Sequence, residues 1–291
     1  MNYEELLEKL NIDEEGRIIF RTLHYRTERD DFRQSIRDAY DAFLGGNDAF
    51  RAYVVSFAKD EYVPAEHMNL YLTIVLSEPA RDKLRSMGMD DEVFYDSLSD
   101  VNSVCLRYKA KAGIYGIDVN DANWYRYALE GTMFRFGRLQ FQLAKSEYSL
   151  VEDGVEIKRG EPVLFVHVPA GDSLSEEACN ASYKAALPFF KKYFGFECLP
   201  CFCYSWLLQP WLDGVLAPNT NIINFKATYR LIETIYSVNH TFMFIFPGSY
   251  ATVDDYPVDN PLRREAIRRL RENEFIGYGV GVRIVREDTL A

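Results

Sequence analysis

An apolar run that leads through a short loop into a long helix is the feature that most restricts the fold of this chain. Residues 163–168 read VLFVHV, with His167 as the one polar side chain. A run this apolar is typical of a strand that is covered on both faces of a sheet. The loop 169–172 follows, and Ser173 with Glu176 matches a capping box, which predicts that a helix begins at this serine. A second apolar segment and a second helical segment come next, so this region predicts strands and helices packed in layers.

The predicted junction between strand and helix has the features of an anion site. The first amide groups of a helix have no partner within the helix, and they lie at the positive end of its dipole. Gly171 lies in the loop, and glycine lets the backbone approach a phosphate closely. A glycine in such a loop is equally consistent with a simple connection that binds nothing. Both interpretations stay open on this feature alone.

Charge and composition exclude several classes of partner. The 44 acidic and 33 basic residues give a formal net charge of −11, whereas nucleic acids and anionic membranes attract basic surfaces. Residues 1–16 are acidic and amphipathic, unlike a signal peptide, and no apolar run is long enough to cross a bilayer. The five cysteines, an odd number, fit a reducing compartment. We therefore expect a cytoplasmic protein with no nucleic-acid and no membrane partner.

The first half of the chain carries mostly helical periodicity. Residues 1–130 predict a helical N-terminal domain, in which residues 17–25 are expected to form a strand or an extended segment. Pro79 is expected to separate two helices, because proline cannot donate a backbone hydrogen bond within a helix.

The second half brings β-forming side chains. Residues 131–291 predict the order strand, strand, strand, helix, strand, helix, strand, with the last strand at residues 277–285. Pro188 is expected to kink or end the helix in which it lies. At 291 residues the chain is long enough for two ordinary domains, and the change of pattern predicts a boundary near residue 130.

The sequence does not predict a metal site. Cys198, Cys201 and Cys203 lie close together, but no second pair and no nearby histidine completes a set of four ligands. His24 and His67 have no histidine at a ligand spacing. We expect no metal, and buried cysteines of the ordinary structural kind.

Several short sequence words of the second half are similar to those of one bacterial acyltransferase family. They are Gly137-Arg138-Leu139-Gln140-Phe141, His167-Val168-Pro169 with Gly171, Phe189-Phe190, Cys203-Tyr204-Ser205-Trp206-Leu207-Leu208 with Pro210, and Asn221-Ile222 with Phe225. Members of that family pair an N-terminal helical N-acyltransferase domain with a GNAT-like C-terminal domain. The resemblance implies an α+β fold, with a helical domain at residues 1–130 and a GNAT-like mixed β-sheet domain flanked by helices at residues 131–291.

The resemblance also implies that the loop after the apolar strand binds acyl-CoA, either acetyl-CoA or a longer acyl-CoA. In GNAT enzymes the backbone amides of this loop hold the pyrophosphate. The cofactor-binding residues implied here are Val168, Ala170, Gly171, Asp172, Ser173, Leu174 and Asn221. The loop departs from the family pattern, because it has one glycine, Pro169 has no N–H, and the carboxylate of Asp172 repels phosphate.

Transfer of an acyl group to an amine requires a base, because an alkyl amine has a pKa of about 10. His167 is the first candidate, since it ends the apolar strand next to the predicted anion loop and imidazole titrates near about 6.5. A buried histidine that bonds to a carbonyl is the alternative interpretation. Weaker candidates, for which the sequence gives no proximity, are Glu130, Glu147, Glu233 and His240.

A proton donor for the departing thiolate is the second catalytic group to be identified. GNAT enzymes commonly use a tyrosine on the helix after the fifth strand, but Lys226 stands where it would be expected. Tyr229 and Tyr204 are the substitutes that the sequence offers. If no acid is needed, orientation of the substrate and polarisation of its carbonyl remain as sources of rate.

Two functions of different classes follow. The first is an N-acyltransferase that moves an acyl group from a CoA thioester to a small-molecule amine acceptor. The second is a GNAT-shaped binding or regulatory protein that has lost catalysis. The incomplete loop and the missing tyrosine favour the second, whereas His167, Gly171 and Asn221 favour the first. The acyl group, the acceptor and the oligomeric state are left open.

Overall fold

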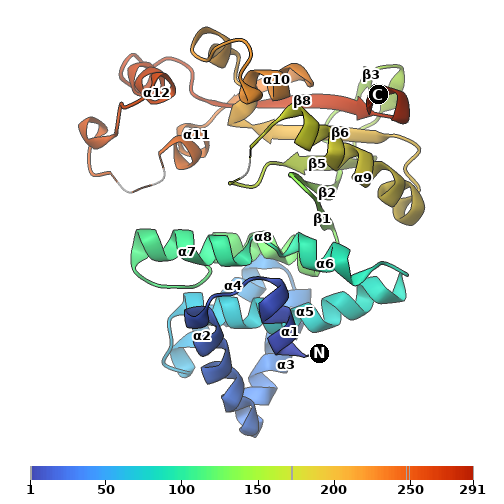
Figure 1. Cartoon of the computed structure of the whole chain (residues 1–291). Coiled ribbons are helices and arrows are strands. Elements are labelled where there is room, and N and C mark those ends of the chain that lie inside the picture. The colour runs from blue at the N-terminus through green and yellow to red at the C-terminus, as the bar shows by residue number, and fades with distance from the viewer. Residues whose placement is uncertain (1, 172, 247, 249, 291) are drawn as a thin grey trace. The chain divides into compact units, whose positions relative to one another are not determined.

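The computed structural model describes residues 2–171, 173–246, 248 and 250–290. The chain forms two compact units, Met1–Phe134 and Arg135–Ala291 (Figure 1). The fold is thus of the predicted α+β class, with a helical unit followed by a unit built on a mixed sheet. The boundary predicted from the sequence lies between residues 130 and 131, whereas the two units divide between residues 134 and 135.

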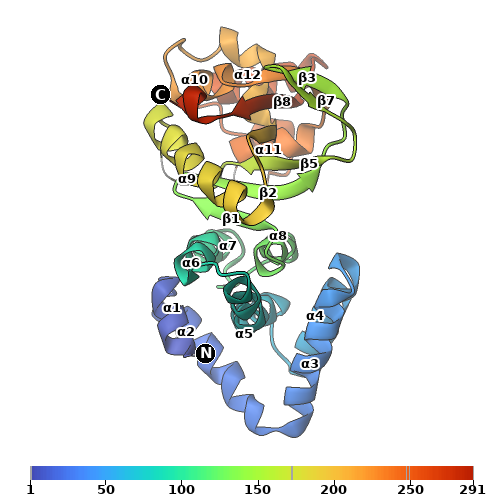
Figure 2. The same ribbon diagram turned by 90° about the vertical axis from the view of Figure 1, so that its right-hand side faces the viewer.

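The first unit consists of helices. Its elements are α1 (Tyr3–Lys9), α2 (Glu14–Tyr25), the 3-10 turn η1 (Arg26–Glu28), α3 (Asp30–Leu44), α4 (Asn47–Asp60), α5 (Ala65–Ser86), α6 (Asp91–Ser97), α7 (Val101–Ala112) and α8 (Val119–Leu129). Helix α5 lies in the middle, with α1 and α2 on one side and α3 and α4 on the other (Figure 2). Tyr71 of α5 is fully buried. Its ring lies 5.4 Å from that of Phe20 and 5.9 Å from that of Phe32, so one aromatic core joins α2, α3 and α5.

The prediction of a strand or extended segment at residues 17–25 is wrong, because these residues belong to α2. The Asp13 side chain caps the helix by accepting a hydrogen bond from the amide of Gly16. Phe20 and Leu23 are buried at helical spacing, whereas the β-branched Ile18 is 54% exposed. Packing of one helical face therefore outweighs the local β-propensity.

Two prolines that were expected to break helices lie inside them instead. Helix α5 continues through Pro79, and α9 (Glu176–Phe194) continues through Pro188. A proline inside a helix costs about 3 kcal/mol. Phe189 and Phe190, which follow Pro188 directly, are both buried, and burial of two such rings is worth more than the lost hydrogen bond.

The second unit is built on a six-stranded sheet in the order β1-β2-β5-β6-β8-β7. The strands are β1 (Met133–Phe136), β2 (Leu139–Lys145), β5 (Pro162–His167), β6 (Leu199–Ser205), β7 (Arg230–Tyr236) and β8 (Gly277–Val285), and a separate hairpin is formed by β3 (Leu150–Glu152) and β4 (Val155–Ile157). The remaining elements are α9, η2 (Trp206–Leu208), η3 (Pro210–Gly214), α10 (Asn221–Ala227), α11 (Val238–Ile245), η4 (Val253–Asp255), α12 (Pro261–Arg271) and η5 (Glu287–Leu290). The last strand lies where the sequence predicted it, whereas β7 was missed.

The parallel strands β5 and β6 separate towards their carboxyl ends. The residues that pair between the two strands are Leu164 with Cys201 and Phe165 with Phe202. Beyond these pairs, β6 stays bonded to β8 as far as Ser205, and β5 stays bonded to β2 as far as His167. The sheet therefore opens between β5 and β6, and we call this gap the sheet opening.

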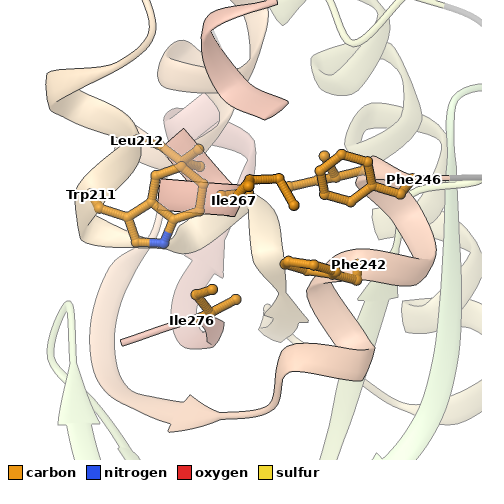
Figure 3. Packing of buried hydrophobic residues seen from close by; sticks show 8 residues of the cluster. Trp211, Leu212, Phe242, Phe246, Ile267 and Ile276 are labelled. Carbon is orange, nitrogen blue, oxygen red and sulfur yellow. The ribbon is translucent and has the colours of Figure 1, made fainter. Parts of the chain in front are cut away.

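A second hydrophobic core lies beyond the sheet opening, in the segment between β6 and β8. Trp211 and Leu212 of η3 pack with Phe242 and Phe246, and with Ile267 of α12 (Figure 3). Trp211 also lies under the guanidinium of Arg269, at 5.2 Å. This core fixes the segment that follows β6 and thereby one wall of the sheet opening.

A carboxyl group in the first turn of α8 offers a test of the first unit. Burial, together with the neighbouring carboxylate of Asp118, raises the pKa of Asp121 to about 6. Because the folded state holds the proton more tightly than the unfolded state, stability falls as the pH rises from about 4 to about 6. We expect Asp121→Asn to raise the free energy of unfolding at pH 7 by about 1 kcal/mol, after allowance for partial exposure.

The gain should shrink towards pH 4, because the carboxyl of the folded state is then protonated and that of the unfolded state, with a pKa of about 3.9, is about half protonated. Thermal unfolding from pH 4 to pH 8 measures this effect. Asp48→Asn, in the exposed first turn of α4, is the matched control and should show no pH-dependent gain. Equal gains for both variants would contradict the assignment to burial of Asp121.

Candidate functional site

The loop between β5 and α9 lies next to the sheet opening. Gly171 has φ +118°, a conformation that side chains rarely adopt. Helix α9 begins at Glu176, and the side chain of Ser175 caps it by accepting a hydrogen bond from the amide of Ala178 at 3.2 Å. The predicted cap at Ser173 is therefore wrong by two residues. Of the predicted loop residues, Asp172 lies outside the described residues.

The side chain of Arg138 is hydrogen-bonded to this loop. It is 8% exposed, and it donates hydrogen bonds to the carbonyl oxygens of Pro169, at 2.7 Å, and Ser173, at 3.2 Å. Its own amide donates to the hydroxyl of Ser182 in α9. Hydrogen bonds from a charged donor are about twice as strong as neutral ones. Arg138 thus fixes both ends of the loop and places a positive charge beside it.

Helix α10 is joined to the same loop. The side-chain amide of Asn221, at its first residue, donates a hydrogen bond to the hydroxyl of Ser173 at 2.9 Å. Two of the residues that the family resemblance assigned to the cofactor are therefore in contact, although they are 48 positions apart. Val168, Ala170 and Leu174 belong to the same connection, and Leu174 is buried against the fold.

His167 ends β5 and faces the side of the sheet opposite to α9. Its Nε2 lies 2.9 Å from Oε1 of Gln142, on the neighbouring strand β2. Since an amide oxygen can only accept, this contact assigns the proton to Nε2. Burial lowers the pKa of His167 to about 3, so the imidazole is neutral at physiological pH.

Tyr204 lies on the same face as His167, within a group of two carboxylates and two tyrosines. Its hydroxyl donates to Glu147 at 3.2 Å, and its ring packs against Phe165 with centroids 4.8 Å apart and the ring planes tilted by 50°. Tyr148 lies beside it and bonds to Glu233. Burial raises the pKa of Tyr204, and the neighbouring Glu147 carboxylate raises it further. Glu147 and Glu233, which the sequence offered as weaker candidates for the base, thus belong to one group of side chains.

Tyr229 lies on the opposite face of the sheet, towards α9. It is 7% exposed, and its hydroxyl shares a hydrogen bond with that of Tyr183 in α9. Burial raises the pKa of Tyr229 well above its ordinary value. His167 and Tyr229 are therefore separated by the sheet, and the three predicted catalytic side chains do not form one cluster.

Neither tyrosine is a strong proton donor. A thiol has a pKa of about 8.5 and a phenol one of about 10. Because burial raises both phenol pKa values further, protonation of a departing thiolate by Tyr204 or Tyr229 is energetically uphill. The raised pKa values therefore argue against acid catalysis by these two residues.

Sequence reasoning missed Arg138 and Gln142 as members of the site. Arg138 was part of a sequence segment shared with the family, but no role was assigned to it. The signal that could have identified it is its position directly after the turn glycine Gly137, which has φ +57°. Gln142 had no signal in the sequence, because its partner is 25 residues away and the register of β2 and β5 decides the contact.

Among the residues that the structure describes, no group of three or more His, Cys, Asp or Glu side chains is arranged to hold a metal ion. None of the described helices is long and apolar enough to cross a membrane.

Comparison with solved structures shows acyltransferases of the same fold. A mutant acyltransferase in complex with octanoyl-CoA has a TM-score of 0.73 and 22% sequence identity, and the match covers 97% of this chain and 87% of that one. An acyltransferase in complex with decanoyl-CoA and teicoplanin has the same values. A third, in complex with decanoyl-CoA, has a TM-score of 0.65 and 18% identity, over 98% of this chain and all of that one. No curated protein sequence matches the chain significantly.

Comparison with family models matches both units. Residues 1–131 match the N-acyltransferase N-terminal domain, and residues 133–283 match the GNAT-like C-terminal domain. The two matches divide between the helical unit and the sheet unit that the fold shows. The chain therefore belongs to the family of N-acyltransferases that join these two domains, as its sequence words indicated.

Proposed function

We propose that this protein transfers an acyl group from an acyl-CoA thioester to the amine of a small-molecule acceptor. The observation that carries the proposal is the loop of residues 169–175, which Arg138 fixes between the sheet opening and the first turn of α9. A fixed loop at the positive end of a 19-residue helix suits the pyrophosphate of CoA. The acidic side chains in that turn, Glu176 and Glu177, are exposed, whereas the positive charge of Arg138 is buried beside the loop.

The sheet opening suits the arm of CoA that carries the thioester. Where β6 leaves β5, residues 203–205 of β6 are paired with β8 along one edge of the strand and with no residue of β5 along the other. The other edge faces the opening, where the amides of a pantetheine arm can supply the hydrogen-bond partners that β5 no longer provides. In this arrangement the reacting carbonyl lies near the end of β5, next to His167.

His167 is the base in this proposal, and Gln142 positions it. With the proton on Nε2 bonded to Gln142, Nδ1 carries the basic lone pair of the ring. With a pKa of about 3 the ring is too weak a base to deprotonate a free alkylammonium of pKa about 10, so it takes the proton only as the forming C–N bond makes the amine nitrogen acidic. The thiolate of CoA can leave without a proton, since its conjugate acid has a pKa of about 8.5.

The relatives of known structure guide the choice of donor, because they bind octanoyl-CoA and decanoyl-CoA, and one also binds teicoplanin. For this chain we infer a medium-chain acyl-CoA in preference to acetyl-CoA, and an acceptor with a free amine. The free thiols of all five cysteines fit a reducing cytoplasm. A regulatory protein without catalysis remains the outcome that the following tests would reveal.

Gly171→Ala tests the loop. Both Gly171 and Gly160 have positive φ, and an added Cβ would meet nothing within 4 Å at either position. Alanine at either site should therefore cost about 1 kcal/mol of stability through backbone strain alone. We expect Gly171→Ala to weaken CoA binding at least about tenfold, as measured by calorimetry, and Gly160→Ala to leave it unchanged. Unchanged binding in both variants would remove the loop from the CoA site.

His167→Ala tests the base. We expect turnover with an acyl-CoA and a panel of amines to fall at least about a hundredfold, the usual contribution of general-base catalysis, while the dissociation constant for acyl-CoA stays within about twofold. His240→Ala, which removes another half-buried imidazole of the same unit, should change turnover by less than about twofold. Turnover within about twofold of wild type in His167→Ala would exclude this histidine as the base.

Gln142→Glu tests the positioning of His167. A carboxylate at 2.9 Å should favour the imidazolium and raise the pKa of His167 from about 3 by at least about one unit. Gln142→Met, which removes the partner without adding charge, should leave the pKa low. Nuclear magnetic resonance of the imidazole carbons can follow this, because the chain has 4 histidines. Equal pKa values in the two variants would show that Gln142 does not contact the ring in solution.

A further inference from the structure

The side chain of Gln140, on strand β2, is buried although its amide donor is unused. Gln140 is 2% exposed, and within the described part of the chain its Nε2 has no hydrogen-bond partner. Removing an amide donor from water costs folding free energy when nothing accepts its hydrogen bond. An unsatisfied group of this kind in a native fold requires an explanation, and a catalytic role is one.

The register of the sheet places Gln140 directly beside the proposed base. In the antiparallel pair of β2 and β5, the Cα partner of Gln140 is His167. The side chains of such partners lie on the same face of the sheet, with their Cβ atoms about 4.5–5.5 Å apart. Phe141, the next residue of β2, is on the opposite face, where its ring lies 5.5 Å from that of Tyr183 in α9. Gln140 therefore faces the side of the sheet on which His167 lies.

The two glutamines of this face differ in what they bond to. Gln142 lies two residues further along β2, and its Oε1 is 2.9 Å from Nε2 of His167, so it orients the imidazole. Gln140 makes no such contact within the described residues. A methionine of similar size would fill the same space without an unsatisfied donor. Packing therefore does not explain a glutamine at position 140.

The proposed reaction needs a hydrogen-bond donor at this place. The amine nitrogen attacks the thioester carbon, a C–N bond forms, and one electron pair of the C=O bond moves to the oxygen. Donors that are in position before this charge develops, glutamine side chains among them, stabilise the oxyanion. When the C=O bond forms again, the C–S bond breaks and CoA leaves as a thiolate, while His167 accepts the proton of the nitrogen.

We propose that Nε2 of Gln140 donates a hydrogen bond to the carbonyl oxygen of the thioester and stabilises the oxyanion that forms from it. This inference rests on the proposed function, which places the reacting carbonyl at the end of β5, next to His167. Because Gln140 is the strand partner of His167, the two side chains start about 5 Å apart, a distance that a glutamine side chain can span. The thioester oxygen then accepts the hydrogen bond that the fold leaves unused.

Gln140→Met tests the contact, because methionine has a similar length and no donor. The measurement is the infrared stretching frequency of the thioester carbonyl of octanoyl-CoA, isotopically labelled at the carbonyl carbon and bound to the full chain. A hydrogen bond to a carbonyl oxygen lowers this frequency. We expect a lower frequency for the substrate bound to the wild-type protein than for free substrate, and a return towards the free value in Gln140→Met. The measurement requires no acceptor.

Turnover and stability distinguish a catalytic role from a structural one. With an amine that the wild-type protein accepts, we expect Gln140→Met to lower kcat at least about a hundredfold, the usual cost of losing one oxyanion donor. The dissociation constant of octanoyl-CoA should stay within about threefold, because the donor acts mainly on the charge of the transition state. The melting temperature should be unchanged or higher, because an unsatisfied buried donor is removed.

Gln209→Met is the matched control. Gln209 is 0% exposed, and neither its Nε2 nor its Oε1 has a partner among the described residues, but it follows η2 and is not paired with His167. This variant should leave the carbonyl frequency unchanged and kcat within about twofold of wild type.

Three results would contradict the proposal in different ways. An unchanged carbonyl frequency in Gln140→Met, or a kcat within about twofold of wild type, would overturn this inference and leave the proposed function standing. A Gln140→Met protein that no longer folds would show that the amide is a structural partner, and would overturn it as well. If the wild-type protein binds no acyl-CoA, this inference and the proposed function both fail.

Discussion

The buried guanidinium of Arg138 is the contact on which the site depends. Removing a charge from water is costly unless it finds good hydrogen-bond partners, and here two carbonyl oxygens of the loop supply them, at 2.7 and 3.2 Å. Outward movement of the loop would break both of these charged hydrogen bonds. One side chain thus couples the turn after β1 to the loop after β5, and through Ser173 to Asn221 at the start of α10.

The sheet opening forms because the two strands beside it are each paired along their whole length with a different neighbour. Strand β6 is bonded along its whole length to β8, and β5 is bonded along its length to β2. The two pairs can diverge because only Leu164 and Phe165 have partners across the gap. On the β6 side, Leu208 closes against the glycines of β8, and the core around Trp211 holds the following segment in place. The opening is therefore supported on both sides by contacts away from the ligand.

Much of the fold could be predicted from local patterns, and the errors came from tertiary packing. The apolar run at residues 163–168 and the strand at residues 277–285 were found because their side chains are buried on both faces or alternate with glycine. The helix that contains Pro188 was expected to kink or end at this proline, and it continues to Phe194 because Phe189 and Phe190 are buried, which no local rule predicts. The cap moved from Ser173 to Ser175 because both serines suit an N-cap, and the Asn221 contact occupies the first.

The site could be predicted as a loop and a histidine but not as a network. The sequence segments shared with the family pointed to the loop, His167 and Asn221 as candidate site residues. The family itself is confirmed by both domain matches. The contacts that give these residues their chemistry join positions 25 to 57 apart, such as His167 with Gln142 and Tyr204 with Glu147. Such contacts depend on strand register, which a single sequence does not specify.

The ionisable groups of the site share one property, which is that they keep a constant charge across the physiological range. Burial lowers the pKa of His167 to about 3, and burial raises the pKa of both Tyr204 and Tyr229. The protonation of the enzyme therefore does not change between about pH 5 and 9 at these positions. Since an alkyl amine has a pKa of about 10, the acceptor becomes the group whose protonation limits the reaction. The pH dependence of turnover should then follow the amine that is used, and a less basic acceptor should react at lower pH.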